Sequence, residues 1–237
     1  MFLGLALITY CLYFGFKQNH WPFKRILVLI LSLILVLALR NFLVILLLPA
    51  VFSWFLATRG PKKGLVVFVV SYLIYGILFF TIRYADERFD FPAVVVSKQE
   101  AFIAHSGGSE VDVRVLEPTL ESFIINAPQA ISLSSLRPYP SDVRHILSLA
   151  AAVEIFLLLL LFVIFLLTNT GGAHSKNFIY FCVFFAFSLL FTIGYTVNFI
   201  GAIVRYRSLA FPFLIIPMIC QINWTKLLSL LTISEKK

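Results

Sequence analysis

The stretch that decides the fold is Ile146–Leu167, ILSLAAAVEIFLLLLLFVIFLL, whose one ionisable residue is Glu154. A bilayer-spanning helix needs about 20 apolar residues at a rise of about 1.5 Å each, and this run meets that requirement. The whole chain has the same character, since 61% of its 237 residues are apolar and only 13% are charged. Soluble domains are about 45–50% apolar and about 25% charged. The sequence therefore excludes a soluble enzyme and predicts an all-α, polytopic membrane protein.

Further apolar runs predict a transmembrane helical bundle of about seven spans. The predicted spans are 2–16, two within 26–57, 64–82, 146–167, 177–198 and 209–224. A single helix over 26–57 would be about 48 Å long, whereas the hydrocarbon core of a bilayer is about 30 Å thick. A hairpin that turns at Arg40-Asn41 fits this region better. The alternative, one long tilted helix, would leave about six spans and place the N-terminus on the other side.

Basic residues orient the predicted spans, because they accumulate in cytoplasmic loops. The loops 17–25, 58–63 and 169–176 and the C-terminal tail hold ten of the nineteen Lys and Arg residues. The segment 83–145 instead holds nine acidic and six basic residues. This pattern predicts an outward N-terminus, an outward segment 83–145 and a cytoplasmic C-terminus. It also accounts for the formal net charge of +8 without a nucleic-acid partner.

Three regions follow from this topology: a four-span segment 1–82, an extracytoplasmic loop or cap 83–145, and a three-span segment 146–237. The loop shows a capping-box pattern at Ser97-x-x-Glu100, and Pro118 is suited to the start of a helix that Pro128 would interrupt. Sixty residues with few aromatic side chains would make a poor independent core. We therefore expect short interfacial helices on the outer leaflet.

Four charged residues are the candidate substrate-binding site. Glu154 is an acidic residue inside a predicted span, and an ionisable group at that depth marks a functional site by default. Arg40, Arg205 and Arg207 lie at the outer ends of spans in this topology, where guanidinium groups are suited to an anionic phosphate. The alternatives are a structural ion pair for Glu154 and contact with lipid headgroups for the arginines. Arg205 and Arg207 share a side only on an extended backbone; on a helix they diverge.

Asp86 and Glu87, directly after the fourth predicted span, are the weak catalytic candidates, because paired carboxylates serve as base or metal ligand in sugar transfer. Charge bias in an outward loop is the alternative explanation. The sequence has no spacing of His, Cys and Asp typical of a metal site, so we expect neither a metal nor another cofactor. A proton- or ion-coupled transporter would rest on Glu154 alone.

Three short motifs within 118–217 carry a resemblance to a known class of protein. They are Asn126–Ala130 (NAPQA), Leu136–Pro140 (LRPYP) before Val153-Glu154, and Asn198–Arg207 (NFIGAIVRYR) before Pro212 and Pro217. The chain resembles the polytopic inner-membrane proteins of bacterial envelope-polysaccharide clusters, and the later part of GT-C-like glycosyltransferases and O-antigen polymerase-type proteins. GT-C enzymes carry their catalytic acids after the first span, whereas Asp86 and Glu87 follow the fourth.

The resemblance implies an inner-membrane component of envelope glycan assembly that binds a polyprenyl-phosphate-linked sugar at its outer face. Such a component is either a glycosyltransferase, a polymerase-type protein or an inactive relative. A different class, a non-catalytic membrane subunit of a transport or secretion complex, is favoured by the scarcity of polar residues in the spans. In that case the partners are other membrane subunits in addition to the lipid bilayer.

Overall fold

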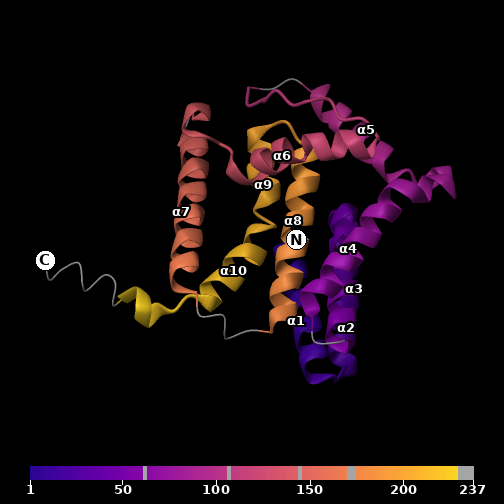
Figure 1. The fold of residues 1–237 in the computed structure, drawn as a ribbon, viewed down its shortest axis with the longest axis vertical. Helices are drawn as coiled ribbons and strands as arrows, with labels where there is room; N and C mark the ends of the chain where they lie inside the picture. Colours follow the sequence, from indigo (N-terminus) through magenta and orange to yellow (C-terminus); the bar gives the residue numbers. More distant parts are fainter. Residues whose placement is uncertain (61–62, 106–107, 144–145, 170–174, 229–237) are drawn as a thin grey trace, which may run out of the picture. The chain divides into compact units, whose positions relative to one another are not determined.

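The computed structural model describes residues 1–60, 63–105, 108–143, 146–169 and 175–228, and Figure 1 shows their path. Within these ranges all regular elements are helices, and the strand-like pairings are two isolated bridges, Glu110 with Phe199 and Asn169 with Ile222. The prediction of an all-α fold is confirmed.

The helices follow the apolar runs of the sequence closely, because a backbone within a lipid bilayer has to satisfy its own hydrogen bonds. The long elements are α1 (Phe2–Gln18), α2 (Phe23–Leu39), α3 (Asn41–Arg59), α4 (Gly64–Thr81), α5 (Phe91–Ile103), α6 (Leu120–Leu136), α7 (Ile146–Thr168), α8 (Lys176–Thr196), α9 (Ile200–Arg207) and α10 (Phe211–Gln221). Short 3-10 turns lie at η1 (Ile82–Tyr84), η2 (Glu87–Phe89) and η3 (Pro140–Asp142).

Four helices in the described part of the chain are long and apolar enough to cross a membrane: α3, α4 continued by η1, α7 and α8. Helices α9 and α10, which bend by 50° at their junction, make a fifth if they form one broken span. Helices α1 and α2 have 17 residues each and are shorter. The structure thus supports a multi-pass membrane protein with four or five spans of full length, fewer than the seven predicted.

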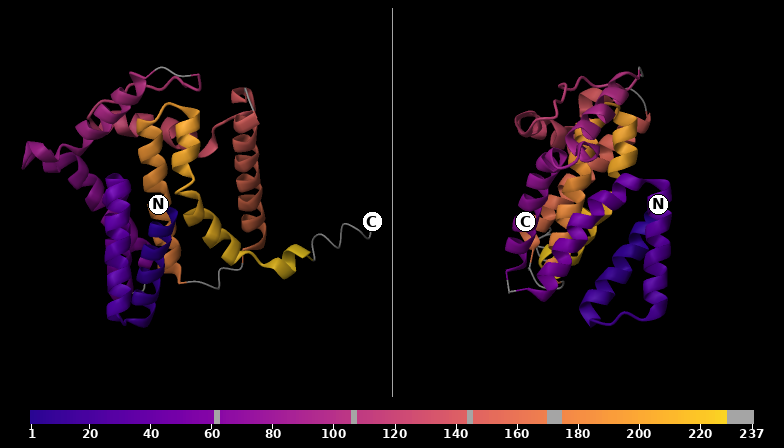
Figure 2. Two further views of the ribbon diagram at one scale, coloured as in Figure 1. Left: turned by 180° about the vertical axis from the view of Figure 1, so that it is seen from behind. Right: turned by 90° about the vertical axis from the view of Figure 1, so that its right-hand side faces the viewer.

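The predicted break at Arg40-Asn41 is present. Arg40 has φ −157° and ψ 88°, outside the helical region, so α2 ends at Leu39 and α3 begins at Asn41. At the other end of α2, Asn19 adopts the left-handed conformation (φ 49°, ψ 30°) that commonly ends a helix, and the chain turns from α1 into α2. Figure 2 shows the hairpin that α1 and α2 form.

Two predictions within 83–145 are wrong in their local detail. Pro128 does not interrupt its helix, because α6 runs from Leu120 to Leu136 with Pro128 inside it. Proline removes one hydrogen bond of the helix, but buried residues on both sides of it, including Phe123 and Leu133, hold the segment in place. Ser97 is not a helix cap, because it lies inside α5. The cap is Asp90, whose carboxylate accepts a hydrogen bond from the Ala93 amide at 3.0 Å.

The chain forms two compact units. The first comprises Met1–Leu78 and Lys176–Leu189, and the second comprises Phe79–Ser175 and Leu190–Lys237. The first part of α8 therefore belongs with α1–α4, whereas its last turns belong with α6, α7, α9 and α10. These units are defined by compactness. The three regions predicted from membrane topology, with boundaries at 82 and 145, are a different division and stay a prediction.

Aromatic packing forms the core of the first unit. Trp54 on α3 is buried and stacks on Phe181 of α8, with ring centroids 4.7 Å apart. Phe16 of α1 meets the Trp54 ring edge-on at 4.9 Å. The Asn177 side-chain amide donates to the Ala57 carbonyl at 2.9 Å, which ties the start of α8 to the end of α3. Aromatic pairs of this kind add about 0.5–1.5 kcal/mol each beyond the area that they bury.

The core of the second unit lies where α6 and α9 pack against the last turns of α8 (Figure 1). Its buried apolar centre consists of Leu133, Ile193, Val197 and Ile203. The Tyr195 hydroxyl donates to the Phe123 carbonyl at 2.8 Å. At Gly194 the backbones of α6 and α8 approach so closely that a Cβ atom would overlap the Ala130 carbonyl. Small residues allow this approach at helix interfaces in membranes.

We expect Gly194→Ala to destabilise the protein by roughly 3 kcal/mol, since the added methyl group collides with backbone rather than with a flexible side chain. Gly76 on α4 provides the matched control, because nothing lies within 4 Å of its hypothetical Cβ atom. Gly76→Ala should leave stability unchanged or raise it by up to about 1 kcal/mol. Thermal unfolding of both variants in detergent measures the difference. Equal melting temperatures would contradict the close α6–α8 contact.

Candidate functional site

Arg207, the last residue of α9, is fully buried in the second unit. One terminal nitrogen, Nη2, lies 3.3 Å from Oε2 of Glu154 on α7, and the other, Nη1, donates to the Arg137 carbonyl. The guanidinium carbon also lies 5.2 Å from the centre of the Phe211 ring. One side chain thus joins α9 to α7 and to the segment that follows α6.

Glu154 is less buried than its partner, with a side chain that is 41% exposed. It lies eight residues after the start of α7, about 12 Å along the helix. A buried charge is stable only with a counter-charge and hydrogen-bond acceptors. The Glu154 carboxylate supplies Arg207 with a counter-charge and an acceptor. The structure therefore contains the ion pair that the sequence analysis gave as the alternative role of Glu154.

Arg205 lies two residues before Arg207 on the same helix but is exposed. Two residues on a helix differ by about 200° in direction, so the side chains diverge. Of the two backbone conformations considered from the sequence, the helix is therefore the one found. The Arg205 guanidinium lies 5.4 Å from the centre of the Tyr206 ring, and no carboxylate of the described residues lies within 4.0 Å of it.

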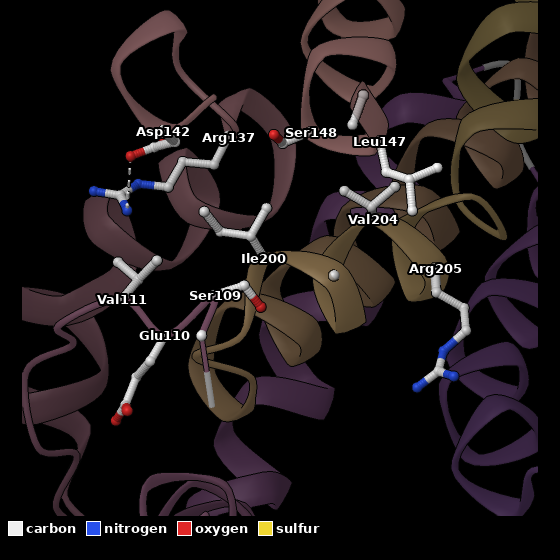
Figure 3. Close-up of a pocket in the computed structure, with 13 residues that line it drawn as sticks. Ser109, Glu110, Val111, Arg137, Asp142, Leu147, Ser148, Ile200, Val204 and Arg205 are labelled. Carbon is white, nitrogen blue, oxygen red and sulfur yellow. Dashed lines mark ion pairs between the residues drawn. The ribbon is translucent and has the colours of Figure 1, made fainter. Parts of the chain in front are cut away.

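A cavity of about 590 Å³ lies in the second unit, close to this arginine (Figure 3). Leu147, Ser148 and Ala151 line it from α7, and Ile200, Gly201, Val204 and Arg205 line it from α9. The remaining wall comes from 108–111 and from Arg137 and Asp142. Its walls thus combine an apolar surface with hydroxyl and charged groups.

Backbone pairing fixes the 108–111 wall. The Val111 amide donates to the Asn198 carbonyl at 2.9 Å, and the Ile200 amide donates to the Ser109 carbonyl at 3.0 Å. The buried Asn198 side chain also donates to the Glu110 carboxylate, at 3.4 Å. These contacts hold a polar segment against the start of α9, next to Gly201.

The charged groups of the cavity are partly paired with one another. Arg137 and Asp142 lie 3.8 Å apart, and Figure 3 shows this pair at one edge of the cavity and Arg205 at the other. Asp142 also accepts a hydrogen bond from the Tyr139 amide at 2.9 Å. Among the described residues that line the cavity, Arg205 is the cation without a carboxylate partner.

The other predicted residues lie elsewhere. Arg40 is half-buried at the break between α2 and α3 and belongs to the first unit, whereas Glu154, Arg205 and Arg207 belong to the second. Within the second unit Glu154 and Arg207 form an ion pair. Arg205 lines the cavity and contacts neither Glu154 nor Arg207 through an ion pair.

Asp86 and Glu87 lie at η2. Asp86 pairs with the Arg88 side chain at 2.7 Å and also accepts a hydrogen bond from the Arg88 amide at 3.0 Å, and these two interactions, the side-chain one first, hold the pKa of the Asp86 carboxyl below its usual range. Such a carboxylate is a weak proton acceptor at neutral pH. Glu87 is exposed. A catalytic role for this pair stays a prediction.

Across the described residues, no three His, Cys, Asp or Glu side chains form a group suited to a metal ion.

Sequence reasoning missed the wall formed by Ser109, Glu110, Arg137 and Asp142. The LRPYP motif contains Arg137, but nothing in its spacing places that residue beside α9. The pairing of 109–111 with 198–200 joins segments far apart in the chain, and isolated bridges of this kind leave no periodic pattern in a sequence.

Glu154→Gln should destabilise the protein, because it leaves the buried Arg207 without a counter-charge. We expect a loss of about 2 kcal/mol, below the ~3–5 kcal/mol typical of a fully buried pair because Glu154 is partly exposed. Glu100→Gln on α5, an exposed carboxylate, is the matched control and should have no measurable effect. Thermal unfolding in detergent measures the stability of the Glu154→Gln and Glu100→Gln variants. Equal stability of the two would show that the Glu154–Arg207 pair does not stabilise the fold.

Comparison with protein-family models, with curated proteins and with solved structures finds no match for this chain. The resemblance to proteins of envelope-polysaccharide clusters therefore stays an expectation from short motifs.

Proposed function

We propose that this chain is an integral inner-membrane component of bacterial envelope glycan assembly that binds a polyprenyl-phosphate-linked sugar in the cavity of the second unit. The observation that carries the proposal is Arg205, an exposed guanidinium without a carboxylate partner among the described residues, on the rim of a cavity with apolar walls. A lipid phosphate needs both features, a cation for its headgroup and an apolar surface for its chain.

The chemistry of the lining supports a phosphate ligand. A guanidinium group offers two parallel N–H donors that match the oxygens of a phosphate. Ser109 and Ser148 add hydroxyl donors on the same cavity, while Leu147 and Val204 provide apolar surface. Arg205 is exposed and forms no ion pair with another described residue, so binding requires no rearrangement of an ion pair.

The glycan context comes from the resemblance, and the position of its motifs supports it. The LRPYP motif contributes Arg137 to the cavity, and the NFIGAIVRYR motif contributes Ile200, Gly201, Val204 and Arg205. Motifs that lie far apart in the sequence thus line one cavity.

The proposed topology counts α9 and α10 as one broken span, which makes five longer spans, and adds α1 and α2 to give seven. Each has 17 residues and a length of about 26 Å, at the lower limit for a span. With the N-terminus outside and the C-terminus in the cytoplasm, the cavity faces outward, where glycan assembly from polyprenyl-linked donors takes place. Basic residues in 17–25 and 58–63 support this orientation.

A second candidate function is that of a non-catalytic membrane subunit. Helix α7 favours it, because large apolar side chains along its length, such as Leu147, Phe156 and Leu166, are more than 60% exposed. Such a face contacts either lipid or a partner helix. Purification of a stoichiometric partner with this chain would favour the subunit.

The proposal predicts that Arg205→Gln weakens binding of a polyprenyl phosphate roughly tenfold or more, since a charge-assisted hydrogen bond is lost. Arg88→Gln, which removes another exposed positive charge from the same unit, is the control and should bind normally. Titration of the purified protein with polyprenyl phosphate measures both, and polyprenol without the phosphate should not bind. Equal binding by the two variants would refute the role of Arg205.

Gly201→Leu tests the cavity itself. A Cβ atom at Gly201 meets its nearest neighbour, Ser109 Oγ, at 3.9 Å, so a larger side chain enters the cavity without a backbone collision. We expect lost lipid binding and lost surface glycan at an unchanged protein level. An unchanged glycan profile in cells, with the variant present in the membrane, would count against the proposed function.

A further inference from the structure

The first unit has an unbalanced charge distribution. Its residues, 1–78 and 176–189, contain no Asp or Glu, whereas they contain eight Lys and Arg residues. Seven of the eight fall within the sequence segments 17–25 and 59–63 and at position 176; the exception is Arg40. Like charges without counter-charges repel one another, so an arrangement of this kind is stabilised by an anionic partner from outside the unit.

The helix ends next to these segments meet at one end of the first unit. The end of α3 is joined to the start of α8 by the hydrogen bond from Asn177 to Ala57, and Gly64 at the start of α4 packs against the Asn177 side chain. Phe16 near the end of α1 packs on Trp54 and Phe55 near the end of α3. Figure 2 shows the α1–α2 turn at the same end as the start of α4.

The helix termini add to the positive potential there. Lys24 and Arg25 lie in the first turn of α2, and Lys176 begins α8, positions where the helix dipole favours negative charge. The first turns of α2, α4 and α8 contain no acidic residue. Cations therefore occupy sites that would suit anions, and this increases the attraction of the surface for a negative ligand.

A cavity of about 530 Å³ opens at this end, lined by Phe16, Asn19, Trp21, Phe55, Thr58 and Arg59. Three of these side chains are aromatic, and the Arg59 guanidinium lies 4.4 Å from the centre of the Phe55 ring. The Trp21 ring is held against Gly15, where a Cβ atom would overlap it. The cavity thus offers an aromatic surface beside an exposed guanidinium, the pair of features that membrane-interface sites present to lipids.

We propose that this cavity and the surrounding cations form a binding site for a phospholipid with a net negative headgroup. Arg59 and Lys63 contact the headgroup phosphate, and Trp21 and Phe55 contact the glycerol and the upper part of the acyl chains. Charge complementarity selects an anionic lipid over a zwitterionic one, and the apolar lining selects a lipid over free phosphate. The site lies in the other unit from the proposed glycan-lipid cavity and does not depend on that function.

Titration of the purified protein in a neutral detergent with phosphatidylglycerol, phosphatidylcholine or inorganic phosphate tests this site. Brominated acyl chains quench tryptophan fluorescence on contact, so Trp21 reports occupancy. We expect phosphatidylglycerol to bind at least tenfold more tightly than phosphatidylcholine, and binding to weaken at high salt. Trp21→Phe should remove most of the quenching without abolishing the thermal stabilisation by the lipid.

Arg59→Gln combined with Lys63→Gln should weaken phosphatidylglycerol binding roughly 25-fold, about fivefold for each cation removed. Arg88→Gln combined with Lys98→Gln removes two exposed charges from the second unit and should not change binding. Where the first double variant fails to fold, Arg59→Gln alone, with an expected loss of about fivefold, and the salt dependence of binding to the wild-type protein test the same charge contribution.

Three results would overturn the proposal: equal binding of phosphatidylglycerol and phosphatidylcholine, equal loss in both double variants, or competition by inorganic phosphate at the lipid's own concentration. Displacement of the lipid by an acidic protein segment would assign the surface to a protein partner instead.

Discussion

Burial of a guanidinium group is costly unless a counter-charge lies beside it, and the second unit of this chain contains one at Arg207 with no exposed surface. Glu154 supplies the counter-charge at 3.3 Å, and the carbonyl of Arg137 accepts a further hydrogen bond. The requirement therefore fixes α9, α7 and the segment after α6 relative to one another. Because Arg137, α7 and α9 also line the cavity, its walls are positioned by the same interaction.

The same unit illustrates how a strongly apolar chain keeps a polar site. The close approach of α6 and α8 at Gly194 buries the apolar centre formed by Ile193, Val197 and Leu133. With α8 ended at Thr196, the extended residues 197–199 pair with the 109–111 segment before α9 begins. Serine, glutamate and arginine groups are thereby held beside α7. Arg207, which is buried and paired, and Arg205, which is exposed on the cavity, lie two residues apart on α9 and point in different directions. The first therefore contributes to stability, and the second is accessible to a ligand.

The positions of the longest apolar helices were predictable from the sequence, and the contacts between helices were not. Apolar runs located α7 over 146–168 and the break at Arg40, since membrane-length helices depend on composition and local backbone preferences. The course of α6 through Pro128 depends on packing of distant side chains, which outweighs the local preference for a break. The charged candidates Glu154, Arg205 and Arg207 were found as ionisable residues in or beside spans. Which arginine pairs with Glu154 depends on the helical phase of α9. The sequence was compatible with either a helical or an extended backbone there, so it did not decide between the two arginines.

The central claim, that the second unit is organised around the Arg207–Glu154 interaction, is tested most directly by a double-mutant cycle. Unfolding free energies in detergent are measured for the wild type, Arg207→Met, Glu154→Leu and the double variant. A direct interaction predicts a coupling energy of about 1–3 kcal/mol, with the double variant less destabilised than the sum of the single variants. Additivity within about 0.5 kcal/mol would show that the two side chains are independent and would contradict this account.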